Sequence, residues 1–213
     1  WTSRGPQWLT VPVHHSRNTK IKDVEINNAL PWARKHFKSL EQSYRKVKYW
    51  TDYKYYLEHY YLETKWDHLS QLNGQMLVWF LHELNITVKI LKASEYQFHG
   101  TKADLVLDMC LQLGASTYVF GALGKDYVTE ENLKEFNRCG IEVRFQDYQH
   151  PQYEQFGGEF MSHLSVLDLL FHHGPKAKEI LLNVQLMLLP MLLRLMRVIQ
   201  FQKTIYGKMF VDN

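Results

Sequence analysis

Hydrophobic positions change their spacing repeatedly through the middle of the chain. The segment 86–94 (ITVKILKAS) is rich in β-branched residues, and the same character returns at 116–121 (STYVFG) and 141–148 (IEVRFQDY). Between them, 101–114 and 129–140 have apolar residues at helical spacing, with a Thr at the start and a Gly at the end. The predicted order is β-α-β-α-β, which favours a parallel sheet with helical crossovers.

The N-terminal part of the chain predicts a hairpin followed by helices. Two short β-type runs, 7–13 (QWLTVPV) and 21–26 (IKDVEI), are separated by a loop of hairpin length. Residues 31–84 are predicted to be mainly helical and rich in aromatic side chains. We therefore expect a single α/β domain over residues 1–182, with a mostly parallel sheet flanked by helices and a helical insertion at about 31–84.

The end of the chain, residues 183–213, is expected to be a C-terminal helical extension. Its apolar run is interrupted by Asn183, Pro190, Arg194 and Arg197. A membrane span needs about 20 apolar residues with few charges, so we predict no span. The expected structure is a helix kinked at Pro190 that packs on the body or on a second chain, which would make a homo-oligomer. Peripheral membrane contact is the weaker alternative.

Composition and charge exclude some classes of protein. Hydrophobic residues make up 46% of 213 residues, so global disorder is excluded. The formal net charge of +3 is far from that of a dedicated nucleic-acid binder. The two cysteines lack metal-site spacing, and no signal peptide is visible, so we expect a cytoplasmic protein. The predicted helix near 31–48 has a basic face, which is either simply solvated or contacts phosphate or anionic lipid.

Candidate ligand-binding residues follow from the predicted sheet. In open α/β sheets, ligands bind outside the carboxyl ends of the strands. Three loops should meet there: 94–100 (SEYQFHG), 121–127 (GALGKDY) and 147–158 (DYQHPQYEQFGG). Their aromatic and amide side chains suit a polar organic ligand such as a sugar or nucleotide. The candidates are Ser94, Glu95, Gly121, Gly124, Lys125, Tyr127, Gln146, Tyr148, Tyr153, Gln155 and Ser165.

Several motifs leave alternatives open. The glycines of 121–127 could approach a phosphate or simply form a tight turn, because the spacing matches no established phosphate loop. In the predicted helix of 164–174, Ser165, Asp168 and His172 share one stripe. These three side chains can line a ligand site or hydrogen-bond one another. Alternatively, Ser165 caps the helix, Asp168 favours its start and His172 lies near its end. The chain has four histidines between 150 and 173 but lacks an established metal motif, so we predict no metal. Cys110 is expected to be a small buried residue rather than a nucleophile.

Three stretches resemble the WbqC-like family of bacterial proteins: GPQWLTVPV, STYVFGALGKDY and FQDYQHPQYEQFGGEFMSHLSVLDLLFHHG. The resemblance covers most of residues 1–182. Members of the family often lie in O-antigen and other surface-polysaccharide gene clusters, and a role as a glycine or other aminoacyl transferase has been proposed for them. The chain departs from the family at His172-His173-Gly174, where members usually have Asn and Gly, and in its apolar C-terminal extension.

The resemblance implies a transferase that attaches a small acyl or aminoacyl group to a sugar intermediate of surface polysaccharide. Its partners would be a sugar or nucleotide sugar and a small acyl donor, with no nucleic acid; whether it uses a cofactor is unknown from the sequence. We expect His150 to be the general base, since imidazole changes charge near neutral pH, and Asp168 to orient the base or the sugar. Tyrosines 127, 148 and 153 would stack on the ligand, and Gln146 and Gln155 would bond it. The alternatives are a non-catalytic sugar- or nucleotide-binding partner, or a nucleotide-activating enzyme suggested by fold analogy alone.

Overall fold

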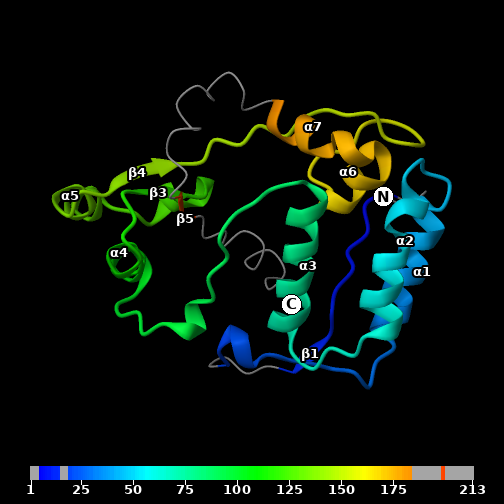
Figure 1. Cartoon of the computed structure of the whole chain (residues 1–213), viewed down its shortest axis with the longest axis horizontal. Helices are drawn as coiled ribbons and strands as arrows, with labels where there is room; N and C mark the ends of the chain where they lie inside the picture. The colour runs from blue at the N-terminus through cyan, green and yellow to red at the C-terminus, as the bar shows by residue number, and fades with distance from the viewer. Residues whose placement is uncertain (1–4, 15–18, 184–197, 200–213) are drawn as a thin grey trace. The chain divides into compact units, whose positions relative to one another are not determined.

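The computed structural model describes residues 5–14, 19–183 and 198–199, which combine helices with two small sheets (Figure 1). Their packing divides them into two compact units. The first unit contains the described residues up to 89 together with 150–183, and the second contains 90–149 together with 198–199. The expected single domain over 1–182 stays a prediction.

The regular structure of the first unit is mainly helical. They are α1 (Trp32–Tyr44), α2 (Trp50–Glu58), α3 (Leu69–Glu83), α6 (Val166–His173) and α7 (Ala177–Asn183), and a π-helical turn, His59–Glu63, continues α2. Phe171 of α6 is fully buried, and the rings of Tyr44, Trp50 and Tyr53 pack around it with centroids 4.7, 5.2 and 6.3 Å away. The helical prediction for 31–84 is confirmed, and its apolar faces form the core of this unit.

The predicted hairpin exists but is short. β1 (Val13–His14) pairs antiparallel with β2 (Glu25–Ile26), while residues Ile21–Asp23 form a 3₁₀ turn instead of extending the second strand. Leu9, Val11 and Val13 alternate toward the helical core. This alternation gives 7–13 its strand-like pattern, but only its last residue belongs to the ladder.

The second unit contains a small parallel sheet. Its order is α4 (Lys102–Leu113), β3 (Thr117–Phe120), α5 (Glu130–Arg138) and β4 (Glu142–Phe145). β3 and β4 pair in parallel from Thr117↔Glu142 to Phe120↔Phe145, and β5 (Val198–Ile199) also pairs in parallel with β3. The predicted α-β-α-β order over 101–145 is confirmed, including the cap at Thr129 and the left-handed end at Gly114.

The predicted first strand at 86–94 is wrong. The segment is irregular except for a 3₁₀ turn at Ala93–Glu95, and Val88 and Ile90 are exposed by 50% and 45%. A β-branched run becomes a strand only where a partner strand and a packed face are available. The segment instead crosses from the first unit to the second. The mostly parallel sheet flanked by helices is therefore not confirmed; the described sheets have two and three strands.

In the part of the chain that the structure describes, no helix has the length and apolar character needed to cross a bilayer. Of the predicted C-terminal helix over 183–213, Asn183 ends α7 and Val198–Ile199 form the strand β5 instead of helix, while its other residues, Pro190 included, lie outside the described ones.

Candidate functional site

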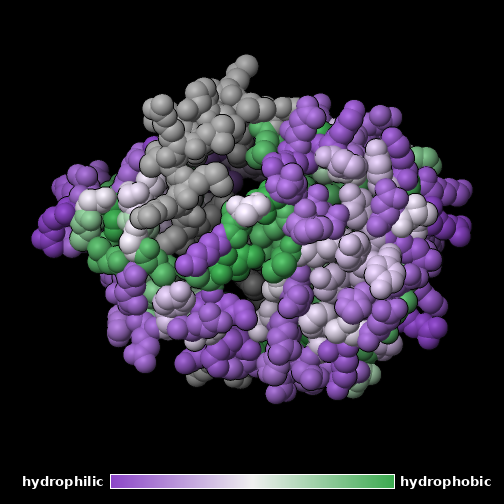
Figure 2. Space-filling view, viewed as in Figure 1, coloured by the Kyte–Doolittle hydropathy of each residue, from purple (hydrophilic) through white to green (hydrophobic). Residues whose placement is uncertain are grey.

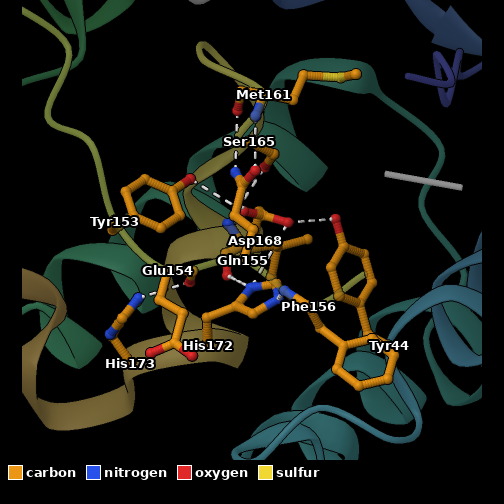
Figure 3. Close-up of polar contacts among 11 residues, drawn as sticks. Tyr44, Tyr153, Glu154, Gln155, Phe156, Met161, Ser165, Asp168, His172 and His173 are labelled. Carbon is orange, nitrogen blue, oxygen red and sulfur yellow. Dashed lines mark hydrogen bonds and ion pairs between the residues drawn. The ribbon is translucent and has the colours of Figure 1, made fainter. Parts of the chain in front are cut away.

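Asp168 of α6 is a buried carboxyl group at the centre of a polar network (Figure 3). Only 1% of the residue is exposed. The Tyr44 hydroxyl donates to Oδ1 over 2.9 Å, and the Tyr153 hydroxyl and Gln155 Nε2 donate to Oδ2 over 3.0 and 2.9 Å. Neutral donors thus supply the bonds that a buried carboxyl group needs.

His172 does not act as a cation toward Asp168. Its Nδ1 lies 3.7 Å from Asp168 Oδ1 but 2.7 Å from the Asp168 main-chain oxygen. A carbonyl oxygen can only accept, so Nδ1 carries the proton. Nε2 in turn accepts from the Phe156 N–H over 2.8 Å and therefore carries the lone pair. The imidazole is neutral, and it fastens the loop before α6 to the helix.

The loop 153–161 is fixed by its own Gln155 side chain and by the side chains of His172 and His173 in α6. Gln155 bonds both main-chain groups of Met161: Nε2 donates to the carbonyl and Oε1 accepts from the N–H, over 2.9 and 2.8 Å. His173 Nε2 donates to the Glu154 carbonyl over 2.9 Å. Figure 3 shows these contacts converging beside Asp168. The loop therefore has a defined conformation despite its two glycines.

Raised pKa values follow from this burial. Burial raises the pKa of the Tyr44 hydroxyl far above its ordinary value, and the charge of Asp168 and its hydrogen bond raise it further. Tyr44 consequently remains a proton donor to Asp168 throughout the range in which proteins fold. Its role at this position is to hold the carboxyl group and not to exchange protons.

His150 stands in a cluster of aromatic rings next to this network. We use the name aromatic cluster for His150, Tyr153, Phe160 and His163. The His150 ring centroid lies 4.7 Å from that of His163, 6.0 Å from Phe160 and 6.1 Å from Tyr153. Tyr153 belongs to both groups, because its hydroxyl bonds Asp168 while its ring packs edge-on against Phe160 at 5.4 Å. The network thus positions one wall of the aromatic cluster.

The tautomer of His150 is set by its own backbone. Nδ1 lies 2.9 Å from the Pro151 carbonyl oxygen, so Nδ1 donates and Nε2 carries the lone pair. The residue is half-buried. Burial lowers the pKa of His150 below its ordinary value; the Pro151 bond opposes this, His163 lowers it further and the charge of Asp168 raises it. The group fits a neutral base at pH 7.

The second unit brings together another set of sequence-predicted residues. Because Phe120 and Phe145 are paired, Gly121 and Gln146 leave neighbouring strand ends, and the Gln146 N–H donates to the Phe120 carbonyl over 2.8 Å. Gly124 packs so closely that a Cβ would lie 2.5 Å from Phe120 Cβ, which supports the tight-turn alternative for 121–127.

Other candidates of this unit lie in the same turns. Lys125 Nζ stands over the Phe145 ring at 5.9 Å. Burial raises the pKa of both Tyr127 and Tyr148. These residues belong to the second unit, whereas His150, Tyr153, Gln155 and Asp168 belong to the first. That the two sets line one crevice stays a prediction.

Two expected placements need correction. Ser94 and Glu95 do not follow a strand, because 86–94 forms none; they lie in a 3₁₀ turn, where Glu95 pairs with exposed Lys92 at 3.8 Å. They therefore share no sheet edge with Gly121. Ser165 is the N-cap of α6 and its Oγ accepts from the Leu167 N–H over 3.4 Å, which matches the capping alternative.

Metal and thiol chemistry have little support in the described residues. Within 5–14, 19–183 and 198–199, no group of three or more His, Cys, Asp or Glu side chains could hold a metal ion. Cys110 is fully buried, as predicted, and burial raises its pKa to about 11, away from the values of reactive thiolates.

Sequence reasoning missed Tyr44 and Phe160, and it weighed His163 only as a metal ligand. Tyr44 lies 124 residues before its partner Asp168, and nothing in its helical surroundings distinguishes it from the neighbouring core aromatics. Phe160 follows a pair of glycines and gave no periodic signal, although the aromatic density of 147–158 was the reason to predict a ligand-binding loop there. Both omissions involve contacts that only tertiary structure creates.

Comparison with known proteins gives a family but no structural template. A model of the WbqC-like protein family matches residues 1–180. A protein of Mycobacterium tuberculosis (strain ATCC 25618 / H37Rv), named uncharacterized protein Rv1507c, is 32% identical over 183 residues, covering 84% of this chain and 78% of its own length. No solved structure matches the chain significantly. With the family match spanning both the aromatic cluster and the Asp168 network, the chain belongs to the WbqC-like protein family.

Proposed function

We propose that this protein transfers a small acyl or aminoacyl group to a sugar intermediate of bacterial surface polysaccharide, with His150 as the general base. The observation that carries the proposal is the His150 imidazole, whose Nδ1 is committed to the Pro151 carbonyl and whose Nε2 therefore has the lone pair. Its lowered pKa keeps it neutral at pH 7, which a base requires.

The surroundings of His150 suit a sugar acceptor. Tyr153 and Phe160 present rings at 6.1 and 6.0 Å from the imidazole, and aromatic faces are good platforms for the apolar side of a sugar ring. Exposed Glu154 and Glu159 border the same loop and offer acceptors for hydroxyl groups. The transfer reaction itself is inferred from the resemblance to the family.

The proposed step needs no electron donor or acceptor. An amine or hydroxyl of the sugar attacks the carbonyl carbon of an activated acyl donor, such as a thioester, and a new C–N or C–O bond forms. His150 Nε2 takes the proton of the attacking group. The carbon–sulfur bond then breaks, and the same proton passes to the departing thiolate, which returns His150 to its neutral form.

Asp168 is a positioning residue in this proposal. Its oxygens point to Tyr44, Tyr153 and Gln155, and its burial keeps it from a ligand. Through Tyr153 it holds one ring of the aromatic cluster, and through Gln155 it holds the loop. Asp168→Asn should therefore lower stability and raise KM, and Tyr153→Phe, which keeps the ring, should reproduce part of the rise in KM.

The test is a product assay with amino and hydroxy nucleotide sugars offered against aminoacyl and acyl thioesters. Acyl transfer is read as the mass gain of the sugar. Wild type should give product, and His150→Gln should give none while unfolding at the same denaturant concentration. His82→Gln, at an exposed position in the same unit, is the matched control. Product formation by His150→Gln at the wild-type rate would overturn the assignment.

A second function, sugar binding without catalysis, is favoured by the aromatic cluster alone. Stacking on Tyr153 and Phe160 requires no base. Under this alternative, wild type and His150→Gln bind the sugar without forming product, while Tyr153→Ala weakens binding. Calorimetric titration of the same sugars distinguishes the two functions.

A further inference from the structure

Helix α1 separates its charged and buried residues onto opposite faces. At 100° per residue, Trp32, His36, Phe37, Leu40 and Tyr44 share the side that packs into the core. The opposite side and the turn that follows it carry the exposed cations Arg34, Lys35, Lys38, Arg45, Lys46 and Lys48. We use the name basic face for these six residues.

The basic face concentrates the positive charge of the protein. Residues 31–48 contain six cations and one carboxylate, Glu41, whereas the whole chain has a net charge of only +3. None of the six forms an ion pair with another residue in the described part of the chain; Lys48 instead stands over the Tyr49 ring at 4.7 Å. Hydrophilic residues also dominate the edge of the molecule where α1 and α2 lie (Figure 2).

An exposed tryptophan is fixed beside this face. Trp8 is 79% exposed, the largest exposed fraction among the exposed large hydrophobic residues. Its neighbours are tied to α1: Ser39 Oγ donates to Gln7 Oε1 over 3.0 Å, and His36 Nε2 donates to the Thr10 carbonyl over 3.1 Å. Because Leu9 and Val11 turn toward the core, Trp8 is held outward. Leu30, 52% exposed, stands just before the helix.

We propose that α1 docks on an anionic membrane surface through the basic face, with Trp8 inserted at the level of the headgroups. Anionic headgroups attract clustered lysine and arginine, and tryptophan prefers the interface between headgroups and acyl chains. Helix α1 has 13 residues and is about 20 Å long, and the bonds of Gln7 and Thr10 to it hold Trp8 next to it. This placement does not depend on the proposed transferase chemistry.

A nucleic acid would be recognised differently. Single strands bind in positively charged grooves with several stacking rings, and duplexes accept a helix in the major groove. The basic face lies on one side of α1 and on the turn after it, the other side of α1 is core, and Trp8, 79% exposed, stands next to it. The arrangement therefore fits a broad headgroup surface better than a strand or a groove.

The experiment is sedimentation of the full chain with phosphatidylcholine vesicles, with and without 30% phosphatidylserine, at 50 mM salt. Wild type should bind only the anionic vesicles, and 0.5 M salt should release it because screening weakens exposed charge interactions. The triple variant K35Q/K38Q/K46Q should bind on the order of a hundredfold more weakly, at about fivefold per lysine. The single variant Trp8→Ala should also weaken binding to the vesicles, but it should keep the preference for anionic vesicles.

The control is K89Q/K102Q/K134Q, which removes the same charge at exposed positions outside α1. It should bind as wild type does. Equal loss in both triple variants would show that net charge alone matters and would overturn the proposal. Two results with the wild-type protein would also overturn the proposal. One is that it stays in solution with anionic vesicles, and the other is that it binds a 20-nucleotide single-stranded DNA more tightly than the vesicles at equal salt.

Discussion

The hydroxyl of Tyr44 in α1 donates to Asp168 Oδ1 in α6 over 2.9 Å, and both residues are buried. This bond joins two helices that are 124 residues apart in the chain. The Asp168 carboxyl group holds the loop 153–161, and its position therefore depends on a residue of α1. The stability of the candidate site and that of the helical core are thereby coupled.

Tyr44→Phe should destabilise the protein by about 2 kcal/mol, because the buried carboxyl loses a donor without gaining water. The measurement is urea unfolding followed by tryptophan fluorescence. Tyr55→Phe, at a position 68% exposed, is the control and should change the unfolding midpoint little. Equal midpoints for wild type and Tyr44→Phe would mean that the bond contributes nothing to stability.

His163→Gln should move the acid limb of the rate profile to higher pH. The neighbouring His163 lowers the pKa of His150, so its removal lets that pKa rise toward the ordinary value of 6.5. In wild type we expect the limb of kcat/KM below pH 6.5. The readout is the pH at half-maximal kcat/KM, which a purely structural role of His163 would not shift. A limb that stays in place, or moves to lower pH, would contradict a base at His150.

Acidification should destabilise the first unit through His36. Burial lowers the pKa of His36 below 6.5, against the raising effect of its bond to the Thr10 carbonyl. The unfolded chain therefore binds more protons than the folded one, so stability is retained above pH 6.5 and lost as the pH falls through and below that value. The free energy of unfolding, measured between pH 7 and 5, should vary less steeply in His36→Gln. His82→Gln, at an exposed site, should keep the wild-type slope.

Gly174→Ala should be strongly destabilising. Gly174 has a φ of +49°, and a Cβ there would lie 2.6 Å from Cδ1 of the Tyr49 ring. Both backbone strain and overlap oppose the substitution, at a combined cost of about 3 kcal/mol. Gly114→Ala is the matched control, since Gly114 also has a positive φ but meets no atom within 4 Å. Thermal melts should place the Gly174 variant clearly below the Gly114 variant; the reverse order would show that the overlap is relieved.

Local signals were sufficient for residues 101–145 of the second unit. Thr129 predicts the start of α5, Gly114 the end of α4 and the β-branched run 116–121 a strand, each from a few neighbouring residues, and the structure contains all of them. The segment 86–94 has equally strong β-branched character and forms no strand, because pairing depends on a distant partner that its own sequence does not specify.

The candidate site was predictable only in part. The density of large side chains in 147–158 predicted a ligand-binding loop, which stays a prediction, and in the structure Tyr153 and Gln155 of this loop bond Asp168. The helical stripe of Asp168 and His172 is real, but the sequence left open whether these residues face a ligand or each other. In the structure both residues are directed into the protein. Asp168 accepts from Tyr44, and His172 bonds the Phe156 N–H and the main-chain oxygen of Asp168.

The order in which the units follow one another along the chain affects how the protein folds on the ribosome. The first unit is interrupted at residue 89 and resumes at 150, after residues 90–149 of the second unit have been synthesised. At 5–20 residues per second, the 124 residues between Tyr44 and Asp168 take roughly 6 to 25 s to make. During that time α1 to α3 lack Phe171 and Asp168, so their apolar faces stay open to water. The nascent first unit is therefore a substrate for chaperones until α6 emerges, and the second unit, whose helices and paired strands β3 and β4 are contiguous in sequence, can fold while it waits.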